Sequence, residues 1–164
     1  MRSLLRRLVL AALIAPAAAG VSLAASPAEA APVSTPEQAQ TTQAEITRLT
    51  NLQRTARGCS AVTVDAQLTA AAVAHSTWMV QTRTFSHTGR AGSTFSSRVR
   101  AAGYARPSSE NIAWGYRTPA ELVNAWMKSP GHRANILDCK STTVGVGVAH
   151  TATGTPYYTQ DFGY

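Results

Sequence analysis

Two histidines and one glutamate are the residues whose types and settings best suit chemistry. His87 lies on a polar, glycine-containing loop after a predicted helix, Glu110 begins an apolar segment, and His132 lies in the first turn of a short predicted helix. Loops carried by rigid elements often hold binding residues. Two imidazoles and a carboxylate suit a catalytic or weakly held divalent cation. We therefore predict a weak zinc or magnesium site at these residues, although no spacing motif such as H-E-x-x-H accompanies them.

Glu110 stands out because most acidic residues after position 30 have local structural roles. Of these seven residues, three lie at predicted helix starts, namely Glu37, Asp65 and Glu121. Three more have other simple settings, because Glu45 faces solvent, Asp138 lies at a helix end and Asp161 lies in the last predicted strand. Glu110 follows a proline-containing loop, where its carboxylate can point into a cleft. The alternative is a strand-end carboxylate that lies in water or pairs with an arginine.

The remaining two histidines have simpler explanations. His75 lies on the apolar stripe of a predicted helix, which indicates a hydrogen-bonded histidine in the core or in a cleft wall. His150 ends a predicted strand beside a turn, so we expect it to be exposed to solvent. His132 differs from both, because the positive end of its helix dipole lowers the pKa of the imidazole and favours the neutral form.

Several reaction classes find no support in the motifs. The sequence has no G-x-S-x-G nucleophile elbow, no phosphate-binding G-x-x-x-x-G-K-[ST] and no G-x-G-x-x-G. Ser86 is only a sequence neighbour of His87, which does not give a serine and its base the required geometry. A hydrolase that activates water through a bound ion, or through His87 and Glu110 as catalytic residues, stays open as an alternative.

Helix caps predict how these residues are positioned. The expected helices cover residues 36–57, 66–81, 95–102 and 119–128, with a short one from 130 toward 138. Capping boxes begin at Thr35 with Gln38 and at Thr118 with Glu121, and Ser129 can cap the short helix.

After Cys139 the spacing of apolar residues changes from a period of 3.6 to a period of 2, which indicates strands. The expected strands cover residues 110–115, 144–148 and 158–162. Helices followed by a hairpin, with one more strand between them, predict an α+β domain with a small antiparallel sheet between helices. Gly145 and Gly147 leave one sheet face without side chains, so a helix can approach it closely.

The first 30 residues have the pattern of a secretory signal peptide. A basic start and an apolar run lead to Ala28-Glu29-Ala30, which has the small-x-small form of a cleavage site. The alternative, a membrane anchor, would need roughly 20 uninterrupted apolar residues. Cleavage would leave a short leader (31–39), one domain (40–164) and no transmembrane anchor, with a charge of +5 over 134 residues.

Composition and cysteines agree with a single secreted domain. The chain has 164 residues, a net charge of +7 and 45% hydrophobic residues, which excludes collagen-like repeats and charge-rich disorder. Its positive charge is scattered, so we expect no specific nucleic-acid binding. Cys59 and Cys139 are its only cysteines. In an oxidising compartment they form one disulfide, whereas a metal pair or a thiol nucleophile lacks a supporting C-x-x-C spacing.

Ordered motifs over residues 40–164 resemble those of bacterial secreted CAP domains, the superfamily of cysteine-rich secretory proteins, antigen 5 and pathogenesis-related 1 proteins, also called SCP domains. The motifs are His75-Ser76-x-x-Met79, Phe85-Ser86-His87-Thr88-Gly89, Glu110-Asn111-Ile112-Ala113, Trp126-Met127-x-Ser129-Pro130-Gly131-His132-Arg133-x-Asn135-Ile136-Leu137, Val144-Gly145-Val146-Gly147 and Tyr158-Thr159-Gln160-Asp161-Phe162-Gly163. The resemblance implies an α-β-α sandwich.

The resemblance also implies a central cleft with a His and Glu tetrad that binds a divalent cation. His87 and Glu110 match its first His and first Glu, whereas Ser129 and Tyr157 stand where the family has its second Glu and second His. His132 is our own candidate for a replacement ligand. We expect His75, Ser129 and Tyr157 to line the cleft.

We predict a secreted, monomeric binding or interaction module whose partner is an extracellular protein, a lipid or a small ligand. The alternatives are the hydrolase described above and a lipid or sterol carrier, because the family's fold is shared among several activities.

Overall fold

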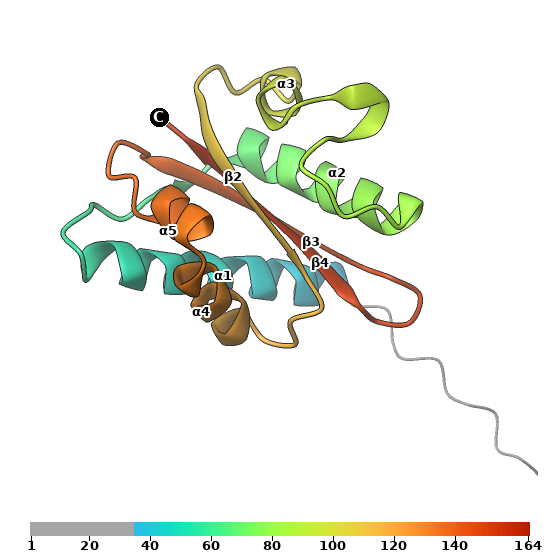
Figure 1. Ribbon diagram of the computed structural model, residues 1–164, viewed down its shortest axis with the longest axis horizontal. Coiled ribbons are helices and arrows are strands. Elements are labelled where there is room, and N and C mark those ends of the chain that lie inside the picture. Colours follow the sequence, from blue (N-terminus) through green and yellow to red (C-terminus); the bar gives the residue numbers. More distant parts are fainter. Residues whose placement is uncertain (1–34) are drawn as a thin grey trace, which may run out of the picture.

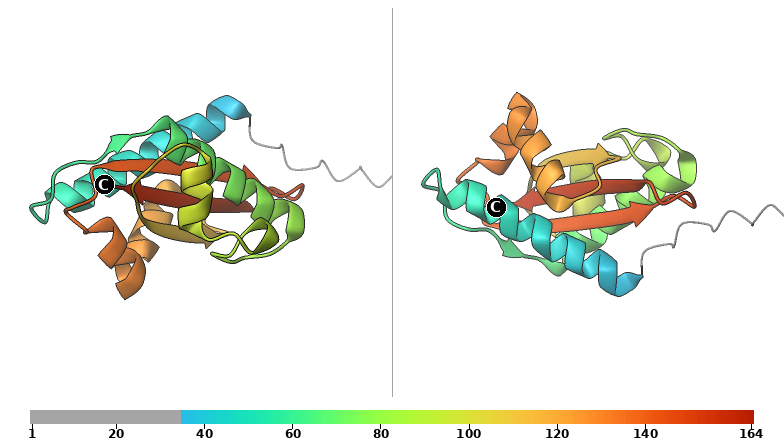
Figure 2. Two further views of the ribbon diagram at one scale, coloured as in Figure 1. Left: turned by 90° about the horizontal axis from the view of Figure 1, so that it is seen from above. Right: turned by 90° about the horizontal axis from the view of Figure 1, so that it is seen from below.

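The chain folds into three layers, a sheet with helices on both faces. The computed structural model describes residues 35–164 (Figure 1). Its elements are α1 (Pro36–Thr55), β1 (Thr63–Val64), α2 (Ala66–Thr82), the 3-10 turn η1 (Arg90–Gly92), α3 (Phe95–Ala101), β2 (Pro107–Trp114), α4 (Pro119–Lys128), α5 (Pro130–Ile136), β3 (Thr143–His150) and β4 (Pro156–Gly163). The two views of Figure 2 show α2 and α3 over one face of the sheet and α1 along the other. The α-β-α sandwich is confirmed.

The predicted helices are present, and their caps match the sequence in part. Thr35 and Gln38 form the expected capping box at α1. At α4 the Thr118 hydroxyl accepts from the Glu121 N–H, but the Glu121 carboxylate accepts from the N–H of Arg117, one residue before the cap. Ser129 takes the predicted N-cap position of α5 with Pro130 after it, but its side chain makes no capping hydrogen bond.

The sheet has the order β1-β3-β4-β2. The β3–β4 hairpin and the antiparallel β2 are the predicted strands. β1 is an addition that pairs in parallel with β3, which makes the sheet mixed. Its two residues are too few for an alternating pattern to be detected in sequence. β2 is an edge strand, and the cleft described below lies along this edge.

The two glycines of β3 bring α2 against the sheet, as predicted. A Cβ at Gly145 would overlap backbone atoms of Leu68 and Thr69, and one at Gly147 would overlap the backbone of Ala72. Neither glycine needs a positive φ, so the requirement is one of space. α2 packs on β3 and β4, and the loop that carries His87 follows the end of this helix.

A buried arginine fastens the segments around the disulfide. Arg54, at the end of α1, is fully buried, and its guanidinium donates to the backbone carbonyls of Ser60, Ile136, Asp138 and Ser141. The predicted disulfide between Cys59 and Cys139 lies beside it. In the chain-entropy model a loop of this length contributes roughly 4 kcal/mol.

The main core lies between the sheet and the α1, α4 and α5 layer. Ile46, Leu122, Trp126, Ile136 and Phe162 are its largest apolar side chains, and each is almost fully buried. No helix within residues 35–164 is long and apolar enough to cross a membrane. The predicted signal peptide (1–30) and the first part of the leader lie outside the described residues; positions 36–39 of that leader belong to α1.

Candidate functional site

Two cavities lie along β2, and together we call them the β2 cleft. One, of about 330 Å³, is lined by His87, Thr88, Thr94, Phe95, Ser109 and Glu110. The other, of about 270 Å³, includes Phe85, Ile112, Trp114, Ser129 and His132 in its wall. Side chains of the helix layer satisfy edge carbonyls of β2, because Asn135 Nδ2 donates to Glu110 O and Trp126 Nε1 donates to Ile112 O.

Two side chains donate hydrogen bonds to the Glu110 carboxylate in the first cavity. The Glu110 side chain is 1% exposed; Oε1 accepts from His87 Nδ1 at 2.8 Å, and Oε2 accepts from Arg98 Nη2 at 2.6 Å. Arg98 also donates through Nη1 to the backbone carbonyls of His87 and Ser93. The arginine expected as the alternative partner of Glu110 is therefore present, and it also fixes the loop that carries His87.

His87 is the exposed member of this group. Its side chain is 57% exposed, and Nδ1 is occupied by Glu110. The other ring nitrogen, Nε2, has no hydrogen-bond partner among residues 35–164. The site thus offers a fixed imidazole to solvent, because a carboxylate bound to one ring nitrogen sets the orientation of the ring.

A second carboxyl group lies behind Glu110. Asp161 is the cross-strand partner of Glu110 in the β2–β4 ladder, and it is 1% exposed. Its Oδ1 has no hydrogen-bond partner within the described part of the chain. Burial, and then the negative charge of Glu110, raise the pKa of Asp161 well above its usual value. Asp161 is therefore a buried carboxylic acid that keeps its proton where ordinary aspartates have lost theirs.

Replacing Asp161 by asparagine is expected to flatten the pH dependence of stability. Between the ordinary aspartate pKa of about 3.9 and the raised pKa, the folded state holds a proton that the unfolded chain has lost. In the wild type, the contribution of Asp161 to the unfolding free energy is therefore greatest below about pH 4. As pH rises above that value, the unfolding free energy falls by at most about 1.4 kcal/mol per pH unit. Asparagine has the same shape and does not titrate.

Urea unfolding at pH 4, 6 and 8 measures this effect as the difference between Asp161→Asn and wild type. The variant should gain stability relative to wild type as pH rises. A difference that stays constant, or that moves in favour of wild type at pH 8, contradicts the raised pKa.

The other predicted site residues are distributed around the cleft. His132 and Ser129 line the second cavity, and Tyr157 stacks on Trp114, with ring centroids 6.1 Å apart. The pKa of His132 is lowered as expected, but the main cause is burial, followed by the charge of His87. His150 is partly buried rather than exposed, because it pairs with Pro156 next to the hairpin turn, and burial lowers its pKa.

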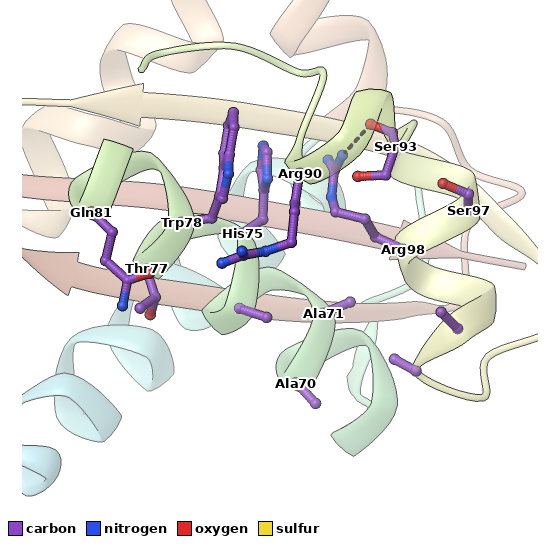
Figure 3. Close-up of a pocket in the computed structure, with 13 residues that line it drawn as sticks. Ala70, Ala71, His75, Thr77, Trp78, Gln81, Arg90, Ser93, Ser97 and Arg98 are labelled. Atoms are coloured by element: carbon purple, nitrogen blue, oxygen red, sulfur yellow. Dashed lines mark hydrogen bonds between the residues drawn. The ribbon is translucent and has the colours of Figure 1, made fainter. Parts of the chain in front are cut away.

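His75 is buried, but it does not line the β2 cleft that was expected for it. It is 1% exposed, and its Nε2 donates to the carbonyl of Ser86. It lines a larger cavity of about 810 Å³ between α2 and α3, separate from the β2 cleft (Figure 3). Burial lowers the pKa of His75, which keeps the imidazole neutral.

The family follows from a comparison of the sequence with known proteins. A model of the cysteine-rich secretory protein family, CAP, matches residues 47–162. This chain belongs to the CAP family.

Several relatives of this CAP domain are bacterial proteins. The uncharacterized protein YkwD of Bacillus subtilis (strain 168) is 34% identical over 130 residues, which are 79% of this chain and 49% of YkwD. An extracellular protein containing a SCP domain from Bacillus anthracis str. Ames has a similar crystal structure, with TM-score 0.71 and 28% identity over 79% of this chain and 43% of that chain. An outer surface protein of Borrelia burgdorferi shares the fold, with TM-score 0.66 and 21% identity over 72% of this chain and 88% of that chain. The chain spans about half the length of YkwD, or less in the case of the Bacillus anthracis protein.

Of the three predicted cation ligands of this CAP domain, His87 and Glu110 contact each other, whereas His132 lies apart from them. Within residues 35–164, no three His, Cys, Asp or Glu side chains form a group that could hold a metal ion. Both oxygens of Glu110 are occupied, and one of them contacts the permanent positive charge of Arg98. His132 lines the other cavity. These contacts do not fit a divalent cation, whose place beside the carboxylate is taken by the guanidinium group.

Two residues that shape the CAP site are not selected by sequence reasoning. Arg98 is distinguished in the sequence only by its nearness to Arg100, and Asp161 only as a residue of the last strand. The sequence did hint at a residue such as Arg98, because Glu110 had no local role and an arginine partner was the alternative interpretation. Asp161 gave none, because its pairing with Glu110 depends on the register of two strands about 50 residues apart.

Proposed function

We propose that this CAP domain is an extracellular ligand-binding module and that its ligand occupies the β2 cleft. Support for the location comes from the disulfide and from similar proteins that are described as extracellular or outer-surface. The observation that carries the binding role is the geometry at His87, an imidazole that is fixed by a buried carboxylate and open to solvent on its other side.

The groups around His87 indicate what kind of ligand the cleft accepts. When Nδ1–H donates to Glu110, the neutral imidazole leaves Nε2 as an acceptor for a ligand hydroxyl or amide N–H. Ser109 Oγ, in the same cavity, is buried without a hydrogen-bond partner among the described residues. Phe85 and Trp114 line the second cavity, and each side chain is about half exposed. A ligand with polar donors and one apolar face satisfies both sets of groups.

A fragment screen tests this role. We expect fragments detected by ligand-observed NMR to bind the wild-type domain, and a subset with hydroxyl or amide groups to lose at least about fivefold in affinity in His87→Gln. Because His87 Nδ1 donates to the buried carboxylate of Glu110, this variant should also lose about 1–3 kcal/mol of stability, so urea unfolding must show that it is folded under the conditions of the screen. His150→Gln, at the far end of β3, is the matched control and should keep all fragments. Equal binding to all three proteins would argue against the β2 cleft as the site.

The hydrolase alternative has one specific observation in its favour. A carboxylate bound to Nδ1 is also the arrangement that orients a histidine as a general base toward water. Within residues 35–164, however, no serine, threonine or cysteine side chain is hydrogen-bonded to His87, so a side-chain nucleophile has no contact with this base. His87→Gln separates the two roles in an assay with ester and peptide substrates, because turnover that disappears in this variant would establish the hydrolase.

A further inference from the structure

A cavity larger than either cavity of the β2 cleft lies outside that cleft and has no role in the function proposed above. The α2–α3 cavity, of about 810 Å³, is bounded by α2, α3 and η1, and it shares no lining residue with either cavity of the cleft. Its volume is within the range of about 300–1,000 Å³ that accommodates organic ligands of drug size.

Small side chains and one flat aromatic surface form the apolar part of this cavity. Five alanines line it, namely Ala70, Ala71, Ala74, Ala101 and Ala102. Trp78 stacks on His75, with ring centroids 5.5 Å apart and 9° between the ring planes. Figure 3 shows both rings rising from α2 on the same side, with alanines along the floor. The stacked pair holds the indole in one orientation, so a planar ring can lie against it without loss of much side-chain freedom.

The charged part of the cavity is positive. Arg90 and Arg98 line it, and no acidic residue does. The charge of Arg98 is neutralised by Glu110, whereas the guanidinium of Arg90 has no hydrogen bond or ion pair within residues 35–164. In Figure 3 the Arg90 side chain extends from η1 toward α2. A planar guanidinium can bind a carboxylate or sulfonate through two parallel hydrogen bonds and can also stack on a ring.

We propose that the α2–α3 cavity binds a planar organic anion, an aromatic ring that lies against Trp78 and carries a carboxylate or sulfonate held by Arg90. The size of the cavity, the fixed indole and the unpaired guanidinium each match one part of such a ligand. His75 adds a further contact point, since its buried Nδ1 has no partner among the described residues and can accept from a ring hydroxyl or amine.

Two fluorescent probes that share a ring system test the proposal. 8-Anilinonaphthalene-1-sulfonate is anionic, and N-phenyl-1-naphthylamine is its neutral counterpart. We expect saturable binding of the sulfonate to the folded, disulfide-bonded protein, with weaker binding of the neutral probe. Arg90→Gln should weaken the sulfonate roughly tenfold and change the neutral probe less than about twofold. Arg100→Gln, which removes an exposed arginine of α3 outside the cavity, is the matched control and should change neither.

A second pair of variants identifies the cavity itself. Ala74→Trp fills the space over α2 and should reduce binding of both probes at least about tenfold, whereas His87→Gln in the β2 cleft should change neither. The proposal is overturned if Arg90→Gln affects both probes equally, if Ala74→Trp leaves the sulfonate bound, or if His87→Gln abolishes binding. It is also overturned if decanoate displaces the sulfonate probe as well as naphthalene-2-sulfonate does, because the site would then select an aliphatic chain.

Discussion

Replacing Gly147 by alanine is expected to lower the unfolding free energy by at least about 3 kcal/mol. A single added methyl group at this position would overlap the backbone of Ala72 in α2. Backbone atoms in the middle of a helix cannot move separately, so the whole of α2 would have to shift away from β3. Interiors are close-packed, and such a shift would open gaps along the interface. For a domain whose total stability is about 5–15 kcal/mol, this is a large fraction.

Thermal and urea unfolding of Gly147→Ala measure the effect, and Gly131→Ala is the matched control. Gly131 lies in α5, and a Cβ added there would meet no atom within 4 Å, so alanine should be neutral or slightly stabilising. We expect a fall in Tm of roughly 10 °C for Gly147→Ala and none for the control. If both variants unfold within about 0.5 kcal/mol of wild type, α2 does not approach β3 as closely as described.

The second large effect is expected for Arg54→Met, which should lower the unfolding free energy by about 3–5 kcal/mol. Methionine keeps part of the apolar stem but removes all the hydrogen bonds that Arg54 donates to backbone carbonyls on two segments. Those carbonyls would remain buried without partners. Two of them belong to Ile136, the last residue of α5, and to Asp138, so the segment that leads from α5 to Cys139 would lose its anchor.

Urea unfolding with the disulfide intact tests this, with two comparisons. Arg57→Met removes an exposed arginine whose side chain, within residues 35–164, hydrogen-bonds only to Gln53, and it should change stability by less than about 0.5 kcal/mol. Arg54→Lys keeps the charge without the planar fork of donors, so its loss should lie between those of the other two variants. A loss for Arg54→Met as small as that for Arg57→Met would show that the buried network contributes little.

The site shows where sequence reasoning succeeded and where it failed. Elimination among a few carboxylates selected Glu110, and loop context selected His87; the structure places them 2.8 Å apart. The same reasoning added His132, on the basis of its residue type and its place in the first turn of a short helix, and the structure places it in the neighbouring cavity. Residue type indicates which chemistry is available, but the distances between groups on α5, β2 and the loop after α2 depend on how three layers stack.

The sequence by itself determined the local elements of this protein. Capping residues, proline at helix starts, the change of hydrophobic period and the paired glycines act over a few residues, and they predicted the helices, the three main strands and the close approach of α2. The disulfide was predicted because the chain has only two cysteines. Only the tertiary structure decided the electrostatics. Arg98 joins Glu110 from α3 and Asp161 joins it from β4, so both contacts depend on how separate elements pack. Within about 4 Å in a buried setting, charge and desolvation decide which group is paired and which keeps its proton, and no local pattern encodes those distances.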